Sequence, residues 1–293
     1  MSHAQIELPQ AGVRLASSAG RAVLIDGGRS IDVEHRSRGR FGADVMAALA
    51  GWPRFAEWAR DQRASEADPV VDPALLGPCV SRPSAVYAIG LNYRDHAEEA
   101  GLELPASPMV FTKFPSCLAG PCAEIPLTSD TVDWEVELVV VIGAPAARVP
   151  AERTREVIAG YCVGQDISDR RLQFGDRPPQ FSLGKSARAY GPIGPALVSL
   201  DAIRDPDDLG LWCDVAGERM QESRTSNLIF PIAELVAHLS RYCDLQPGDL
   251  IFTGTPAGVG SVRKPRRYLV AGERVTSGIE GLGSLSNLCV EGG

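Results

Sequence analysis

The sequence predicts an α+β fold of mixed, mainly antiparallel β-structure, with a small N-terminal domain. Glycine and proline are abundant in the 293 residues, at 30 and 22 positions, and this favours many strands joined by turns over long helices. Predicted strands and helices do not alternate in a regular series and no internal repeat is found, so a doubly wound parallel sheet is not expected. We assign residues 1–80 to the small N-terminal domain and its linker, and residues 81–293 to the main domain.

Short elements are predicted in the N-terminal part of the chain. Residues 21–25 are strand-like and precede a glycine turn, after which a second strand is expected to begin at Ile31. Asp44 is suited to cap a helix that runs through Trp58, with its apolar residues on one side. The stretch 64–83 is rich in proline, aspartate and serine, which is typical of a linker and places the domain boundary near residue 80.

The main domain is predicted to consist mostly of strands, with two helices. A short helix is expected over 151–157, and Pro231 is expected to open a longer one whose apolar residues follow helical spacing to residue 242. The alternating pattern of 272–290 is typical of β-hairpins. Apolar runs predict further strands at 85–90, 109–114, 135–142, 161–163 and 249–253.

Composition and charge exclude several classes of protein. The formal net charge is −8, which disfavours nucleic acid or an anionic membrane as a partner, because both require a basic surface. The short basic run 263–267 is better explained as an active-site rim or a solvated loop. No apolar run reaches the roughly 20 residues that span a bilayer, and the N-terminus lacks the features of a signal peptide, so we expect a soluble, cytoplasmic protein. The seven cysteines and four histidines show no disulfide or zinc-site spacing.

Three carboxylates near the ends of two predicted strands form the first candidate site. Glu135 and Glu137 alternate along one strand, so their side chains share a face and lie roughly 7 Å apart along the backbone. Considered alone, this pair is equally compatible with a strand end whose polar face lies in water. Asp166, at the end of the next strand, favours a metal site, because three carboxylates with open coordination positions suit Mg²⁺ or Mn²⁺. Such an ion can bind a 2-oxo acid through its carboxylate and keto oxygens.

Five motifs follow one another along the chain in a recognisable order. They are residues 92–99 (Asn-Tyr-Arg-Asp-His-Ala-Glu-Glu), 133–143, 164–173, 184–186 (Gly-Lys-Ser) and 253–260. This set resembles the fumarylacetoacetate hydrolase family, which includes acylpyruvate hydrolases and oxaloacetate decarboxylases, from about residue 83 to the C-terminus. The resemblance implies the β-roll of that family, folded around a divalent ion held by Glu135, Glu137 and Asp166, and it implies a homodimer.

A histidine and a glutamate in the first motif match the catalytic dyad of the family. His96 and Glu99 are three residues apart in a predicted helical turn, so their side chains share a face and the carboxylate can orient the imidazole. Without the other motifs, a surface histidine in an acidic helix would be the simpler explanation. The resemblance implies that His96 activates water as a general base, on a lid that orders over bound substrate.

The remaining motifs supply residues for substrate binding. Lys185 lies in a Gly-Lys-Ser triplet, but Pro179 stands where a phosphate-binding loop requires glycine, so ATP or GTP binding is not expected. The resemblance instead places the Lys185 ammonium near the substrate oxyanion, where it stabilises enolate charge. It also implies that Arg170 and Gln173 bind the oxo acid and that Thr255 contacts its carboxylate, although a tight turn alone also explains Thr255.

One segment departs from the family pattern. Family members usually have an aromatic residue and an aspartate after the lysine, whereas residues 186–192 are Ser-Ala-Arg-Ala-Tyr-Gly-Pro. We therefore expect Arg188 to lie near the pocket, where its charge would favour a substrate with a second carboxylate.

The leading functional interpretation is a Mg²⁺- or Mn²⁺-dependent hydrolase that cleaves a carbon–carbon bond in a small 2,4-dioxo acid of the acylpyruvate type. An oxaloacetate-type decarboxylase is the next alternative, because the sequence does not separate loss of a carboxylate from attack by water. An isomerase or dehydratase of a 2-oxo acid is a third. The altered segment 187–189 also allows a degenerate binding protein, although the retained carboxylates, dyad and Lys185 argue against it.

Overall fold

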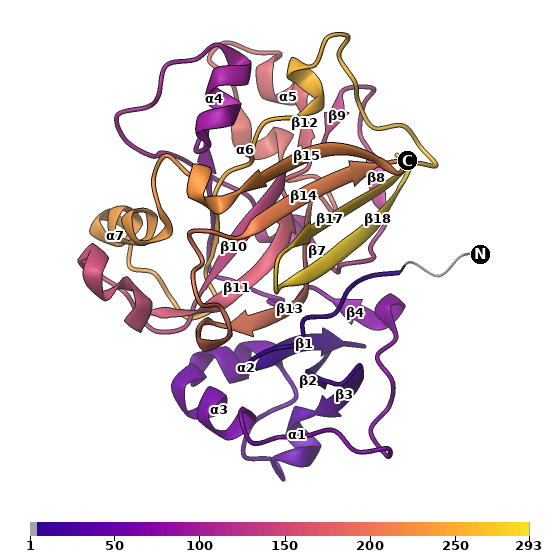
Figure 1. The fold of residues 1–293 in the computed structure, drawn as a ribbon, viewed down its shortest axis with the longest axis vertical. Helices are drawn as coiled ribbons and strands as arrows, with labels where there is room; N and C mark the ends of the chain where they lie inside the picture. Colours follow the sequence, from indigo (N-terminus) through magenta and orange to yellow (C-terminus); the bar gives the residue numbers. More distant parts are fainter. Residues whose placement is uncertain (1–4, 293) are drawn as a thin grey trace.

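The computed structural model describes residues 5–292, which form an α+β structure with three sheets of mostly antiparallel strands (Figure 1). The predicted fold class is confirmed. Residues 1–4, on which part of the signal-peptide expectation rests, lie outside the described residues. The largest sheet has the order β3 (Arg29–Asp32), β2 (Arg21–Asp26), β1 (Arg14–Ser18), β13 (Gly191–Ser199), β11 (Ile158–Gln165), β10 (Val136–Ile142), β16 (Leu250–Phe252), β5 (Val86–Gly90) and β6 (Met109–Thr112). Beside this path, β4 (Leu76–Gly77) pairs with β1, and β7 (Leu118–Ala119) pairs with β13.

A second sheet packs against the first. Its order is β15 (Glu218–Arg224), β14 (Gly210–Val215), β17 (Arg274–Ile279), β18 (Gly283–Glu291) and β8 (Ile125–Leu127), and a separate pair joins β9 (Val132–Asp133) to β12 (Ser168–Asp169). Leu138 and Val140 of β10 belong to the same apolar cluster as Leu211 of β14 and Val275 of β17. Contact between these side chains closes the two large sheets over a common core.

Seven α-helices lie within residues 5–292. They are α1 (Val33–Arg36), α2 (Val45–Ala50), α3 (Trp52–Ala59), α4 (Arg94–Ala100), α5 (Arg170–Phe174), α6 (Phe181–Gly184) and α7 (Ile232–Tyr242). The single helix predicted from Asp44 to Trp58 is wrong. Gly51 ends α2 and Pro53 lies at the start of α3, so two helices form. The helix expected at 151–157 is a 3₁₀ helix over Ala151–Glu156.

The longest of these helices is too short to span a bilayer. α7 has 11 residues and follows Pro231, as predicted. Crossing a bilayer takes about 20 residues, so no helix in the described part of the chain reaches that length with an apolar composition.

The strand that carries the carboxylates is buried on both faces. Leu138 and Val140 of β10 face the second sheet. Val139 and Val141 lie in a different cluster, with Leu49 of α2 among their neighbours. This alternation follows from the two-residue period of a strand. β10 is therefore held from both sides, which fixes the positions of the acidic residues at its start.

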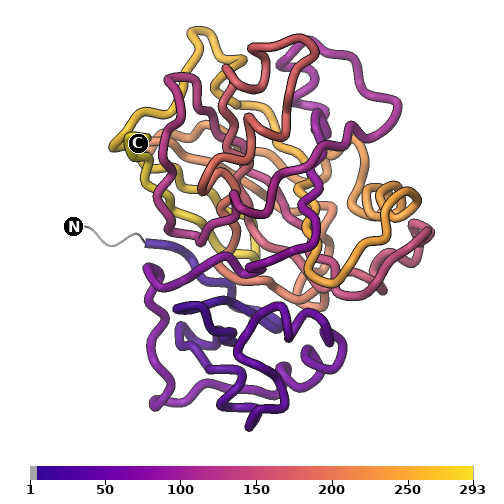
Figure 2. The backbone as a smooth tube through the Cα atoms, turned by 180° about the vertical axis from the view of Figure 1, so that it is seen from behind, coloured from indigo at the N-terminus to yellow at the C-terminus, as the bar shows by residue number. Residues whose placement is uncertain are grey.

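The N-terminal part continues the large sheet. β1 pairs antiparallel with β13, with Leu15 opposite Leu197, and residues 14–59 form one end of the molecule in both views (Figures 1 and 2). The expected domain boundary near residue 80 stays a prediction, because a shared sheet does not decide whether the two parts fold separately.

Candidate active site

The three candidate metal ligands come together where β10 begins and β11 ends. The two strands pair antiparallel with Val136 opposite Gln165. Glu135 and Glu137 flank Val136, and Asp166 directly follows Gln165. One carboxylate oxygen from each acid lies within 4.8 Å of the others, and all three residues are buried. The register of two strands thus gathers acids that are up to 31 residues apart in sequence.

Lys185 is the cation that joins two of these carboxylates. Its Nζ donates to Glu135 Oε2 at 2.8 Å, to Asp166 Oδ2 at 2.7 Å and to the Ser168 hydroxyl at 2.7 Å. Burial by itself would lower the pKa of Lys185, but the charges of Asp166 and Glu135 outweigh it and raise the pKa above its ordinary value. Lys185 is therefore held as an ammonium ion beside two of the candidate metal ligands.

A second buried lysine, Lys113, was not indicated by the sequence patterns. Its Nζ donates to Asp166 Oδ1 at 2.6 Å, to the Tyr190 carbonyl oxygen at 3.1 Å and to the carbonyl oxygen of Lys185. Lys113 thus holds both a candidate ligand and the backbone of the other lysine. The chain contains only three lysines, and two of them meet at this site. That scarcity is a signal from which Lys113 could have been found.

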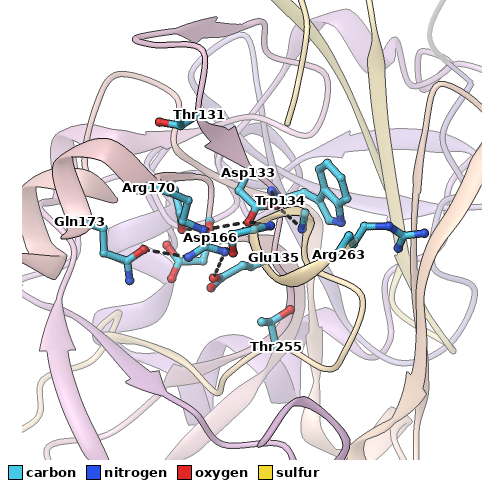
Figure 3. A network of polar contacts seen from close by, with 12 residues as sticks. Thr131, Asp133, Trp134, Glu135, Asp166, Arg170, Gln173, Thr255 and Arg263 are labelled. Atoms are coloured by element: carbon cyan, nitrogen blue, oxygen red, sulfur yellow. Dashed lines mark hydrogen bonds and ion pairs between the residues drawn. The ribbon is translucent and has the colours of Figure 1, made fainter. Parts of the chain in front are cut away.

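Arg170 and Gln173 lie at the site, but their side chains contact protein groups. The Arg170 guanidinium donates to Asp133 Oδ2 at 2.8 Å, contacts Glu135 Oε1 at 2.7 Å and donates to Gln173 Oε1 at 2.8 Å (Figure 3). Asp133 also accepts the backbone N–H of Gly260 at 2.7 Å. Arg170 therefore fixes the orientation of Glu135 and connects it to the 253–260 loop.

With every acid ionised, as metal binding requires, the buried charges of the site leave a surplus of one negative charge. Burial, and then the charges of Asp166 and Glu135, raise the pKa of Glu137 well above its ordinary value. Within residues 5–292 its carboxylate accepts the Gly254 N–H at 2.7 Å and contacts no cation. The full set comprises four buried carboxylates and three buried cations, namely Asp133, Glu135, Glu137 and Asp166 with Lys113, Lys185 and Arg170.

This donor set fits a hard divalent cation. The gathered donors are all carboxylate oxygens, which suit Mg²⁺ or Mn²⁺ better than softer ions. A charge of two would convert the surplus into one net positive charge, and a cationic site of this kind attracts an anionic substrate. The residues present therefore fit both the predicted metal and an organic acid.

The predicted dyad of His96 and Glu99 lies on α4. His96 Nδ1 and Glu99 Oε2 are 3.5 Å apart. Glu99 also accepts the Gly258 N–H at 3.0 Å, and Asp95 accepts the Ser223 hydroxyl at 2.5 Å. Burial alone would raise the pKa of Glu99, but its contacts with His96 and Gly258 lower the pKa below its ordinary value. These contacts attach α4 to the 253–260 loop and to β15.

A cavity of about 780 Å³ is lined by six of the nine predicted site residues, whereas Glu99, Glu137 and Asp166 do not line it. Its wall includes His96, Glu135, Arg170, Gln173, Lys185 and Thr255. The Thr255 hydroxyl donates to the Val136 carbonyl oxygen at 2.9 Å and accepts from Gln221 Nε2 at 2.8 Å, so its polar contacts lie within the protein. The expected position of Arg188 near the pocket is wrong. Arg188 is exposed and does not line the cavity, because the 186–190 turn directs it to the surface.

Sequence comparison identifies similar proteins. The family described as "Fumarylacetoacetate (FAA) hydrolase C-terminal" matches residues 85–290. A protein of Burkholderia multivorans, provisionally named a hydrolase, is 49% identical over 211 residues, which cover 71% of this chain and 74% of the relative. The family match thus covers every motif residue discussed above.

Solved structures with the same fold include enzymes of known type. A Mycobacterium smegmatis protein provisionally named HpcE is 45% identical, with a TM-score of 0.90, and 95% of this chain and 99% of that chain are covered. Fumarylpyruvate hydrolase of Pseudomonas aeruginosa, in complex with Mn²⁺ and pyruvate, is 35% identical (TM-score 0.65; 71% and 90% covered). A 5-carboxymethyl-2-hydroxymuconate delta-isomerase of M. smegmatis is 32% identical (TM-score 0.71; 96% and 98% covered).

Proposed function

Because the chain belongs to the fumarylacetoacetate hydrolase family, we propose that it is a Mg²⁺- or Mn²⁺-dependent hydrolase of an acylpyruvate-type 2,4-dioxo acid. The observation that carries this proposal is the buried triad of Glu135, Glu137 and Asp166 beside a large cavity, with Lys185 bonded to Glu135 and Asp166. The similar Pseudomonas enzyme, crystallised with Mn²⁺ and the 2-oxo acid pyruvate, supports the same chemistry.

The three carboxylates and Lys185 act at the 2-oxo acid end of the substrate. Glu135, Glu137 and Asp166 would hold the ion, which would supply Lewis-acid chemistry to a bound 2-oxo acid. The Lys185 ammonium, buried beside the triad, stabilises the negative charge that develops as the carbon–carbon bond breaks. The neighbouring Arg170 keeps the Glu135 carboxylate oriented.

The dyad supplies the proton transfers. His96 lines the cavity and accepts a proton from water, while the oxygen of that water adds to the carbonyl carbon of the acyl group. The bond between that carbon and the adjacent methylene then breaks, its electron pair forms the pyruvate enolate, and His96 returns the proton to the methylene carbon. The Glu99 carboxylate, 3.5 Å from Nδ1, stabilises the imidazolium formed between these steps.

The proposal is tested by measuring cleavage and metal binding in parallel. Acylpyruvates should lose their enol absorbance and release pyruvate in the presence of Mn²⁺ or Mg²⁺. Glu135→Ala should abolish both this activity and the calorimetric binding of the ion, whereas Glu218→Gln, at an exposed position of β15, should leave both unchanged. Unaltered metal binding by Glu135→Ala would show that the ion binds at another site.

Isomerisation is the second candidate, favoured by the similarity to the M. smegmatis delta-isomerase. An isomerase would use the same metal and Lys185 to stabilise an enolate but would not add water. Product analysis separates the two, because hydrolysis gives two acids and isomerisation gives one. Decarboxylation of an oxaloacetate-like acid and assembly into a homodimer stay predictions of the sequence.

A further inference from the structure

We propose that the acyl group of the substrate is bulky and apolar, an aryl or branched alkyl group, and that Phe111 and Phe181 form the wall against which it binds. This inference rests on the proposed function and names the part of the substrate that the reactive residues do not contact. Its basis is an apolar chamber that begins directly beside Lys185 and makes up most of the remaining cavity.

An aromatic wall starts at the reactive end of the cavity. Lys185 Nζ lies 5.3 Å from the centroid of the Phe111 ring. The Phe111 and Phe181 rings meet edge to face at 5.5 Å, and Phe174 meets Phe181 in the same way at 5.8 Å. Edge-to-face contacts hold such rings in a defined arrangement. A substrate that contacts Lys185 through its oxyanion therefore places its acyl group next to a preformed aromatic surface.

The other walls of the chamber are also apolar. Side chains from β5 and the residue after it, from β6, from α4 and its following loop, and from the 253–262 segment complete it, namely Ile89, Leu91, Met109, Ala100, Leu102, Val259 and Val262. Leu102 is 57% exposed, Phe174 54% and Met109 44%. Large apolar side chains that are exposed together around a cavity indicate that an apolar ligand covers them.

Two arginines, Arg171 and Arg266, also line the chamber and are candidates for binding a second substrate carboxylate. Arg171 already pairs with Asp130, and it is 63% exposed to solvent. Arg266, in the basic run anticipated as an active-site rim, is exposed, and within residues 5–292 its guanidinium has no ion-pair or hydrogen-bond partner. Arg266 is thus the arginine of this wall that, within residues 5–292, has no acidic partner, so the experiment tests whether it favours a carboxylated acyl group.

The test compares substrates and matched phenylalanine variants of the Mn²⁺-loaded enzyme. The kcat/KM should rise from acetylpyruvate through 3-methylbutanoylpyruvate to benzoylpyruvate, by roughly 10-fold or more overall, because added apolar groups in a pocket give gains of this size. Phe181→Ala should lower kcat/KM for benzoylpyruvate by a similar factor and should lower kcat/KM for acetylpyruvate much less. Phe114→Ala, 47% exposed beside β6 and outside the cavity, is the control.

Preference for a carboxylated acyl group would overturn the inference. That result is a higher kcat/KM for fumarylpyruvate than for benzoylpyruvate, with the difference removed by Arg266→Ala and retained in Lys264→Ala. Equal values for all the acylpyruvates would overturn it as well, while leaving the proposed hydrolase intact.

A binding measurement keeps the inference independent of turnover. Calorimetry with Mn²⁺-loaded protein should show at least roughly 10-fold tighter binding of 4-phenyl-2-oxobutanoate than of 2-oxoglutarate, because only the former buries an aryl group against Phe181. If no acylpyruvate is cleaved but this order holds, the proposed function fails and the chamber assignment stands. The reverse order would refute the chamber.

Discussion

Substitution of Lys113 by methionine is expected to destabilise the protein strongly and to increase its response to divalent ions. The side chains of Lys113 and Asp166 are both 0% exposed, and Nζ lies 2.6 Å from Oδ1. Methionine keeps the length of the side chain but removes the charge and the donors to two carbonyl oxygens. Breaking one partner out of a buried ion pair costs roughly 3–5 kcal/mol. Each kcal/mol lowers Tm by roughly 2–4 °C in large domains, so Tm should fall by roughly 6–20 °C.

The ion response gives the prediction its second readout. Loss of the ammonium increases the negative surplus of the triad, so Mn²⁺ should bind the variant more tightly and raise its Tm by more than it raises that of the wild type. Differential scanning fluorimetry with and without Mn²⁺ measures both effects. Lys264→Met, at an exposed position in a loop, is the matched control for removing a lysine. An unchanged Tm in Lys113→Met would refute the view that buried Asp166 needs Lys113 in addition to Lys185.

Three further predictions concern the dyad, Asp169, which caps the start of α5, and the exposed Arg188. In steady-state assays, His96→Ala should lower kcat by roughly 10²–10⁴-fold, and Glu99→Ala should lower it less. The double variant should resemble His96→Ala, because the two residues act as one unit. Full activity of His96→Ala would refute its role as the general base. Burial would raise the pKa of Asp169, but hydrogen bonds from Thr128 and its neighbours lower the pKa below its ordinary value. The ionised Asp169 therefore stabilises the folded protein above the unfolded pKa of about 3.9, and this contribution is lost as pH falls through the lower folded pKa. Acid unfolding measured against pH should show that Asp169→Asn lacks this pH-dependent contribution to stability. Acid unfolding curves that coincide for Asp169→Asn and the wild type would contradict the prediction. Arg188→Ala should leave KM unchanged for mono- and dicarboxylic substrates alike.

Where the side-chain pattern is local, the sequence predicts the structure well. The alternation along β10 and the proline before α7 are short-range signals, and both elements form near the predicted residues. The dyad is a second example, because residues three apart on a helix meet whatever surrounds them. The helix predicted at 44–58 failed for a local reason too, since a glycine and a proline within it outweigh its apolar pattern.

Long-range contacts explain what the sequence patterns did not predict. Lys113 binds Asp166, 53 residues away, and a single lysine after a strand carries no periodic signal. The Thr255 hydroxyl has its partners on β10 and β15, and the position of Arg188 depends on how one turn is oriented. In each case the residue type was visible, but its partner was determined by the tertiary fold.

The junction between β1 and β13 has a consequence for anyone who wishes to isolate the enzyme core. β13 is buried along all nine residues, and β1 covers the edge that includes Leu197 and Val198. Residues of α2 and α3 also belong to the same apolar cluster as Val139 and Val141 of β10. A fragment that starts near residue 83 would expose an apolar surface together with unpaired strand N–H and C=O groups, which is a template for intermolecular pairing. Recombinant work on a minimal fragment would therefore require a replacement strand, or charged residues along β13, to keep the fragment from aggregating.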